Sequence, residues 1–377
     1  MFWRAGLVGL IALALAGVVV YAIARWRRAR REGTARGSLP QILGVLVLCP
    51  VGAELLAAYD GSTGDPGAVA FAVLFFMGLY GAPALLAREL ARRCGWGWPS
   101  LLLLFAALGT AQACLIDQSM FSVDYQGYEG WEAIREETLI PALGISALNA
   151  FTFVGGHVVF SFAAPVALAE AWSPRRAAAS WLGPIGIAVA AGAYAVTAAA
   201  IITDPESQSG SPAQLAVSGA TVAAFIAAAA LLGRRRRSAP AGARRSPALP
   251  AVATAVVAAA VPDFFGQGWA GLSAHLALNA ALCVVIVRAV RRGGWTPWHG
   301  AAVATAFLAV RGLLAFTYFP LIGDVEPGPK YAHNAVMLAV VVIAAVLARR
   351  GGAARSDAAA ADEPAASSEE PVHPPVK

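Results

Sequence analysis

The sequence predicts an all-α membrane protein, a polytopic transmembrane bundle of about eleven helices. Of its 377 residues, 58% are hydrophobic and only 13% are charged, and the mean hydropathy is +0.64. A soluble domain carries about 25% charged residues. The charges lie between apolar runs of roughly 18 residues or more, which is the length that crosses a bilayer as a helix. These runs do not alternate apolar with polar residues, so they exclude a transmembrane β-barrel.

Each apolar run is a predicted span. The first, 5–24, is followed rather than preceded by a cluster of arginines. A cleaved signal peptide has the opposite order, so we expect this span to be retained. The eighth, 248–266, is expected to be a short helix that ends near Pro262, before Asp263. The other predicted spans are 40–59, 67–87, 99–118, 143–171, 181–202, 212–233, 269–289, 300–318 and 333–348.

The charged residues also predict an orientation. If the N-terminus is outside and the spans alternate, every arginine cluster falls on the cytoplasmic side, and the opposite loops are mainly acidic. This is the positive-inside rule, and it places the C-terminus in the cytoplasm. The clusters are 25–36, 88–93, 175–176, 234–245, 288–292 and 349–355.

The chain is predicted to contain one membrane domain, 1–350, and a disordered cytoplasmic tail, 351–377. The tail is rich in Ala, Ser, Pro and Glu and cannot bury a core. The net charge of +6 is confined to the loops, which argues against nucleic acid and for anionic lipid as the partner of the arginine clusters. The four cysteines have no CxxC spacing, so we expect neither a metal site nor a cofactor. The oligomeric state is left open.

Seven polar residues within or beside the spans are candidate ligand-binding residues. An ionisable side chain costs about 2.5–3.5 kcal/mol at the centre of a span, so it usually faces a partner or a cavity. With the predicted directions most of the seven fall in the outer half of the membrane, which predicts an outer-facing polar cavity. The alternative is that they only form hydrogen bonds between helices. They are Glu54, Asp117, His157, Asp263, His275, Asn279 and Arg311.

The surroundings of these residues lead to further expectations. Pro50 precedes Glu54, as prolines do at the helix breaks of transporter sites. Arg311 should pair with Glu54 or Asp117, and with Asp263 as third choice, because an unpaired guanidinium in a span is costly. The loop 119–141, with a short surface helix at 129–139, should lie near the mouth of the cavity. Outside the cluster, we expect a cytoplasmic surface ion pair at Glu170, beside Arg175.

Two resemblances to known families rest on short motifs. The segment 80–125 resembles a family of uncharacterised multi-pass bacterial membrane proteins, through R-E-x-x-R-R from Arg88, G-W-P-S from Gly97 and D-Q-S-x-F from Asp117. This resemblance implies a bacterial plasma-membrane protein with no settled activity. The motifs F-x-x-x-H at His157 and H-x-x-x-N at His275 resemble those of the CPBP (CAAX-type) intramembrane proteases. The glutamate pair of that family has no counterpart within a span, so its general base is missing.

Three functional classes follow from these features. The favoured one is a transporter or solute-binding membrane component for a small solute. The second is an intramembrane hydrolase that acts through His157 and His275. The third is a non-catalytic assembly or accessory protein, in which the polar residues only join helices. Because the carboxylate pair is missing, we expect that the protein is not an enzyme.

Overall fold

The computed structural model describes residues 38–125, 127–234 and 248–361, together with the single positions 20, 23, 24 and 27. Side chains are described throughout these segments except at Asp263 and 353–361. The first predicted span, 5–24, and most of the arginine-rich loop 234–245 lie outside the described residues, as does the predicted tail from 362 onward.

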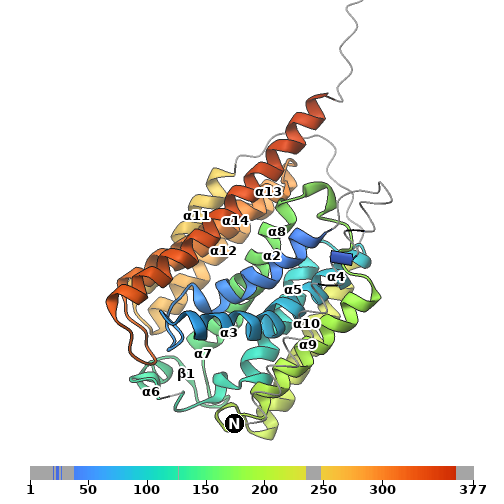
Figure 1. Ribbon diagram of the computed structural model, residues 1–377. Coiled ribbons are helices and arrows are strands. Elements are labelled where there is room, and N and C mark those ends of the chain that lie inside the picture. The colour runs from blue at the N-terminus through green and yellow to red at the C-terminus, as the bar shows by residue number, and fades with distance from the viewer. Residues whose placement is uncertain are drawn as a thin grey trace, which may run out of the picture.

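The described part of the chain is a helical bundle, as the sequence predicts (Figure 1). Eight of its helices are long and apolar enough to cross a membrane, and the shorter apolar helices Leu39–Leu55 and Leu249–Ala260 occupy two further predicted spans. The eighth predicted span is indeed short and ends before Pro262. The eight long helices are Pro66–Arg93, Trp98–Ile116, Ala147–Ala171, Pro184–Ile202, Pro212–Gly233, Trp269–Arg291, Pro297–Thr317 and Pro327–Gly352.

Several of these spans are built from more than one helical element. The first four described spans contain α2 (Leu39–Pro50) with η1 (Val51–Leu55), α3 (Pro66–Phe76) with η2 (Met77–Gly81) and α4 (Ala82–Arg93), α5 (Trp98–Ala111) with η3 (Gln112–Ile116), and α7 (Ala147–Ala150) with η5 (Phe151–Gly155), η6 (His157–Ala163) and α8 (Ala164–Ala171). The later ones are α9 (Pro184–Ile202), α10 (Pro212–Gly233), α11 (Leu249–Ala260), α12 (Trp269–Arg291), α13 (Pro297–Leu314) with η10 (Ala315–Thr317), and α14 (Pro327–Ala361).

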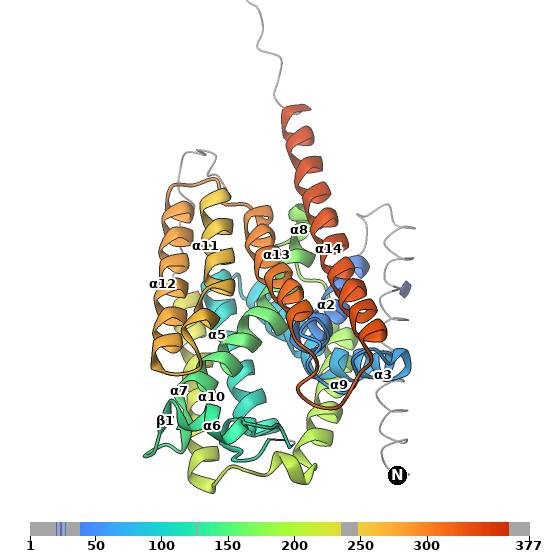
Figure 2. The same cartoon turned by 90° about the vertical axis from the view of Figure 1, so that its left-hand side faces the viewer.

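Helices α2 and α8 lie at the centre of the packing. Helix α8 contacts α2, α13 and α14, while α9 packs on α4 and α10 packs on α5. Figures 1 and 2 show α11 to α14 together on one side of the bundle, with α14 extending beyond the other helices at its C-terminal end. Helices α10 and α12 expose large apolar side chains such as Leu231 and Val284. Lipid tails would cover these apolar surfaces in a membrane.

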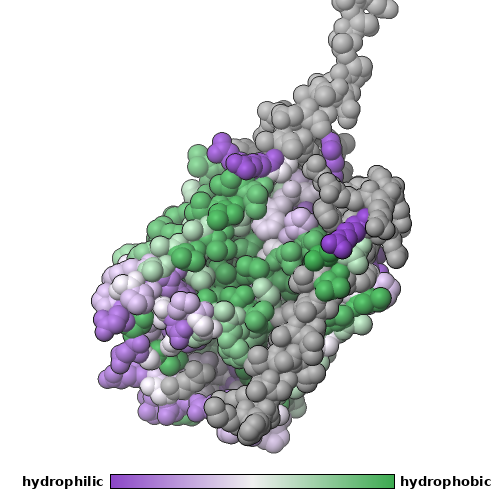
Figure 3. All heavy atoms as spheres, in the orientation of Figure 1, coloured by the Kyte–Doolittle hydropathy of each residue, from purple (hydrophilic) through white to green (hydrophobic). Residues whose placement is uncertain are grey.

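The two ends of the bundle carry different charges. Figure 3 shows an apolar belt between two polar ends. Contacts between α4, α8 and the end of α14 bring the arginine clusters 88–93, 175–176 and 349–352 to one end, called here the arginine end. The acidic loops meet at the other, the acidic end. The side of the membrane that each end faces stays a prediction.

Five segments within the spans are π-helical turns, in which the backbone hydrogen bonds run from residue i to i+5. They are η1, η2, η3, η5 and η6. Pro50 directly precedes η1, while Pro83 and Pro165 follow η2 and η6 by two residues. Proline has no N–H group, so it frees a carbonyl of the preceding turn and favours such a change in pitch.

Two details of the fold go beyond the sequence expectations. The predicted surface helix within 129–139 is present as α6 (Trp131–Glu136), and it leads into a small antiparallel hairpin of β1 (Leu139–Ile140) and β2 (Ile145–Ser146) that was not predicted. Helix α14 continues to Ala361. The first residues of the predicted disordered tail are therefore helical.

Candidate functional site

Glu54 is the centre of a polar cluster inside the bundle. Its carboxylate accepts one hydrogen bond from the Tyr80 hydroxyl at 2.6 Å and a second from the Tyr59 hydroxyl, each on a different oxygen. Both oxygens thus act as hydrogen-bond acceptors. No Lys, Arg or His nitrogen among the described side chains lies within 4.0 Å of this carboxylate. Glu54 is therefore held by two neutral donors and not by a cation.

Asp117 lies near Glu54, at the acidic end of the span Trp98–Ile116. Its Oδ1 accepts hydrogen bonds from the backbone N–H of Ser119 at 2.9 Å and from the Ser119 hydroxyl at 2.8 Å. Burial raises the pKa of Asp117 to about 6, Glu54 contributes to this rise, and the two hydrogen bonds from Ser119 oppose it. Burial, with Asp117 and Glu54, also raises the pKa of the Tyr125 hydroxyl. The two carboxylates and the tyrosine therefore share one electrostatic environment.

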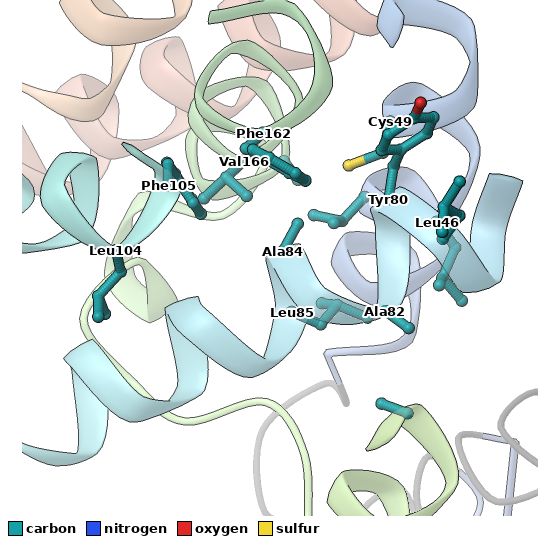
Figure 4. Close-up of a cluster of buried hydrophobic side chains, with 14 of the residues drawn as sticks. Leu46, Cys49, Tyr80, Ala82, Ala84, Leu85, Leu104, Phe105, Phe162 and Val166 are labelled. Atoms are coloured by element: carbon teal, nitrogen blue, oxygen red, sulfur yellow. The ribbon is translucent and has the colours of Figure 1, made fainter. Parts of the chain in front are cut away.

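His157 reaches the same cluster from the span Ala147–Ala171. Its Nδ1 is 2.9 Å from the Ser161 hydroxyl, and its ring centroid lies 5.4 Å from that of Tyr80. Figure 4 shows Tyr80 at the edge of an apolar cluster, with its hydroxyl pointing away from Leu85 and Ala82. Tyr80 therefore connects His157, through ring contact, with the Glu54 carboxylate, through a hydrogen bond.

Arg311 approaches the cluster but does not form the expected ion pair with Glu54 or Asp117. Its Nη2 donates to the Ala53 carbonyl at 3.3 Å, and its guanidinium carbon lies 4.4 Å from the centroid of the Phe160 ring. Its Nε is buried without a hydrogen-bond partner. The guanidinium also interacts electrostatically with His157. In place of these two carboxylates, Arg311 contacts a π-helical carbonyl and an aromatic face. The third expected partner, Asp263, has a side chain outside the described part of the structure.

The π-helical turns explain how these side chains meet. Glu54, Tyr80 and His157 lie on η1, η2 and η6, and Asp117 directly follows η3. The widened turns leave carbonyls that side chains from other helices satisfy: Ala53 accepts from Arg311, Leu55 interacts with His333 at 2.8 Å, and Leu79 accepts from Gln112 at 2.8 Å. Leu79 lies four residues before Pro83, whose missing N–H frees this carbonyl. Such turns occur frequently at functional sites.

Two glycines bring the backbones close together at this level. A Cβ atom at Gly52 would overlap the Phe160 carbonyl oxygen of η6. A Cβ atom at Gly109 would lie 3.0 Å from the Val154 carbonyl oxygen and 3.1 Å from the His157 Cβ atom. Only glycine allows η1 and α5 to approach the span of His157 this closely.

Two further predicted site residues, His275 and Asn279, lie together on α12. The His275 ring packs on Phe151 with centroids 5.2 Å apart. Asn279 donates to the His275 carbonyl within its own helix, at 2.9 Å. The side chain of Asp263 is outside the described part of the structure. Of the seven candidates, the described contacts bring together Glu54, Asp117, His157 and Arg311.

The tyrosines of the cluster were not predicted. Tyr59, Tyr80 and Tyr125 contribute polar groups beside the ionisable residues, but tyrosine also occurs as an ordinary aromatic residue at the ends of spans. The signal available in the sequence was a proline within an apolar span. Pro50 was interpreted as a helix break, whereas Pro83 was not.

A second polar cluster lies at the arginine end and is formed by the R-E-x-x-R-R motif of α4. The Glu170 carboxylate pairs with Arg88 at 3.0 Å and with Arg92 at 2.8 Å, while Glu89 pairs with Arg88 and Arg93. The Arg88 guanidinium also lies 3.3 Å from the Trp181 ring centroid. Glu170 is only 2% exposed. The expected surface ion pair at Glu170 is therefore wrong: the acid is buried and joins α8 to α4.

At the acidic end, Lys330 is fully buried at the start of α14. Its ammonium donates to the Ala315 carbonyl, which also accepts from Asn334 at 2.9 Å. The ring centroids of Tyr318, Phe319 and Tyr331 lie 5.1–5.5 Å from its Nζ atom. No carboxylate among the described side chains lies within 4.0 Å of Lys330. Its contacts are with a carbonyl and aromatic faces, which suits an anchor between α13 and α14.

Residues 41–361 match the model of a family described as an uncharacterized membrane protein family. The chain belongs to this family. Apart from the first two residues of α2, the match includes the described helices from α2 to α14, together with Glu54, Asp117, His157 and Arg311. Neither the curated proteins nor the solved structures contain a match. The family resemblance seen in segment 80–125 is thereby confirmed, and the resemblance to the CPBP proteases is not shown.

Membership of this family establishes a membrane protein and leaves its activity open. Within the described residues, no group of three or more His, Cys, Asp or Glu side chains has an arrangement that would hold a metal ion. The polar and ionisable groups of the central cluster are two carboxylates, a guanidinium, an imidazole and three phenols.

Proposed function

We propose that this protein is a transporter or solute-binding component of a bacterial plasma membrane, and that the Glu54 cluster is its solute site. One observation carries the proposal: a membrane-embedded carboxylate, on a π-helical turn, has two tyrosine donors and no cationic partner among the described side chains. Residues that only join helices are expected to be paired with each other. Glu54 and Arg311 belong to the same cluster but are not paired with each other.

The position of the cluster supports access from one side. Asp117 and Tyr59 are at the acidic end, next to the loops that carry Asp60 and Asp124. With the N-terminus outside and the C-terminus in the cytoplasm, this end faces the outside. The arginine end would then face anionic lipid at the cytoplasmic surface. In the same proposal, residues 1–350 form the membrane domain and the chain beyond them forms a cytoplasmic tail.

The proposal is tested by solute-dependent stabilisation of the full-length protein in lipid nanodiscs. A solute that binds the folded state raises the melting temperature by mass action. A panel of small amines, carboxylates, amino acids and sugars is screened on the wild type, on Glu54→Gln and on Glu136→Gln, a control at an exposed glutamate of α6. We expect at least one solute to stabilise the wild type and the control but not Glu54→Gln. If no solute shows this dependence on Glu54, the proposal is wrong.

The intramembrane hydrolase receives no support from the described contacts. It would act through His157 and His275, whose described contacts are with Ser161 and Tyr80 for His157 and with Phe151 for His275. An accessory protein remains the outcome expected if the solute screen fails.

A further inference from the structure

Arg311 and Glu54 carry opposite charges and both have contacts at the π-helical turn η1, but they do not pair with each other. Arg311 bonds to the carbonyl of Ala53, and the next residue, Glu54, directs its carboxylate to the hydroxyl groups of Tyr59 and Tyr80. In a low-dielectric interior a guanidinium and a carboxylate attract each other strongly. Their separation at this turn is therefore the feature that needs an explanation.

The hydrogen bonding of Arg311 is incomplete. A guanidinium has five N–H donors, and the described contacts of Arg311 are one long hydrogen bond, at 3.3 Å, and one aromatic face. Its buried Nε has no hydrogen-bond partner. A buried donor without an acceptor is costly, and carboxylate or phosphate oxygens match guanidinium geometry. Arg311 thus has unused capacity for an anionic group.

The carboxylates of the cluster can bind a positively charged group. Glu54 interacts electrostatically with Asp117, and no cation among the described residues is paired with either carboxylate. Tyr59, Tyr80 and Tyr125 interact with the pair, and aromatic faces attract ammonium groups. A positively charged group is favoured here.

The partners that each charged side chain lacks distinguish a zwitterion from a simple ion. A solute with only an ammonium group would leave the Arg311 guanidinium without an anionic partner. A solute with only an anionic group would leave the carboxylates of Glu54 and Asp117 without a cation, and charges without a partner are expensive in the membrane interior. A solute that carries both charges brings no net charge and offers a partner to each residue.

From this arrangement we infer that the solute is a small zwitterion of the amino-acid type, whose anionic group binds Arg311 and whose ammonium group lies between Glu54 and Asp117. The inference rests on the proposed function and specifies its substrate class. In this arrangement Glu54 and Arg311 determine specificity from opposite ends of the solute.

The test uses full-length protein in nanodiscs and measures dissociation constants by isothermal titration calorimetry. The probes are glycine, β-alanine, 4-aminobutyrate and 6-aminohexanoate, with propylamine and propionate as singly charged references. We expect one chain length to bind best, and both references to bind at least about tenfold more weakly. Glu54→Gln should weaken the best zwitterion about tenfold or more and leave propionate binding unchanged. Arg311→Gln should weaken the zwitterion similarly and leave propylamine binding unchanged.

Matched controls are Glu136→Gln and Arg288→Gln, which change exposed residues of the same types on α6 and α12. Melting curves and size-exclusion profiles show whether each variant is folded, and the charge-conserving variants Glu54→Asp and Arg311→Lys provide a second series in which weak binding should persist. Propylamine or propionate binding as tightly as the zwitterions would overturn the inference. It would also be overturned if none of the zwitterions binds while another solute class shows binding that depends on Glu54. The proposed function would survive either result, and it fails only if no solute depends on Glu54.

Discussion

The Tyr80 hydroxyl donates to the Glu54 carboxylate at 2.6 Å, although the two residues lie 26 positions apart on different spans. Each lies on a π-helical turn with a proline beside it, Pro50 for Glu54 and Pro83 for Tyr80. The change in pitch rotates the following side chains and frees carbonyls for other helices to bind. This pair shows how prolines in apolar spans create a polar centre without any loop entering the membrane.

The contact between η1 and η6 is predicted to require glycine at position 52. In Gly52→Ala the new methyl group would overlap the Phe160 carbonyl. Overpacking of this kind costs about 1–3 kcal/mol. Gly155→Ala is the control, because nothing lies within 4 Å of a Cβ atom at that position. We expect the melting temperature to fall in the first variant and to stay unchanged or rise in the second. Equal melting temperatures would contradict the close approach.

Asp117 is predicted to make stability depend on pH. Burial raises its pKa to about 6 in the folded protein, above the ordinary value of 3.8. The folded state therefore binds this proton more tightly than the unfolded state does. The stabilisation is fully present below pH 3.8. It is lost as the pH rises through about 6, with a slope of at most about 1.4 kcal/mol per pH unit.

This pH dependence is measured as melting temperature between about pH 3 and pH 8, a range that brackets both pKa values. The wild type should lose stability across this range by more than Asp117→Asn does. Asp124→Asn, at an exposed carboxyl of the following loop, should behave like the wild type. A wild type and Asp117→Asn with parallel pH profiles would show that Asp117 does not titrate in this way.

The arginine-end cluster is predicted to be structural. Glu170→Gln removes the charge that Arg88 and Arg92 share. Loss of one partner from a buried ion pair costs about 3–5 kcal/mol. We expect a large fall in the melting temperature, whereas Arg175→Gln, at an exposed arginine of the adjacent loop, should have little effect. Similar melting temperatures for the two variants would mean that the buried network adds nothing to stability.

Lys330 is predicted to tolerate an apolar replacement of similar length. Its ammonium is buried without a carboxylate partner among the described residues, and Asn334 also donates to the Ala315 carbonyl. Lys330→Met removes a buried charge and keeps most of the packing volume, so its melting temperature should equal or exceed that of the wild type. Lys330→Ala loses that volume and should be less stable. A strongly destabilised Lys330→Met would instead indicate an essential role for the ammonium.

Hydropathy was sufficient to predict the described helices, because crossing a bilayer demands long apolar helices. The short helix before Pro262 was predicted from the alternation of the loops, and the described helix ends at Ala260. The burial of Glu170 could not be predicted, because its partners Arg88 and Arg92 lie 82 and 78 residues away and meet it only when α4 packs on α8.

The central site was predicted in part, for a similar reason. Glu54, Asp117, His157 and Arg311 stand out as polar residues in apolar spans, but their partners depend on three-dimensional packing. At the π-helical turns, Arg311 donates a hydrogen bond to the Ala53 carbonyl, and the Glu54 carboxylate accepts hydrogen bonds from two tyrosines. His275 and Asn279 match the same polar pattern, but spacing along one helix does not specify which neighbour that helix meets: the His275 ring packs on Phe151.

We propose that the Glu54 cluster is a solute site reached from the acidic end. The sharpest test is to label Tyr59→Cys in a chain without other cysteines. Tyr59 is half-buried and donates to Glu54. A membrane-impermeant methanethiosulfonate is added outside intact cells, with Glu136→Cys as the exposed control and mass spectrometry as the readout. We expect the Tyr59→Cys variant to be modified from outside and the solute that binds best to slow this modification. If the thiol of Tyr59→Cys stays unmodified while that of Glu136→Cys reacts fully, the cluster is closed to the outside and the claim is contradicted.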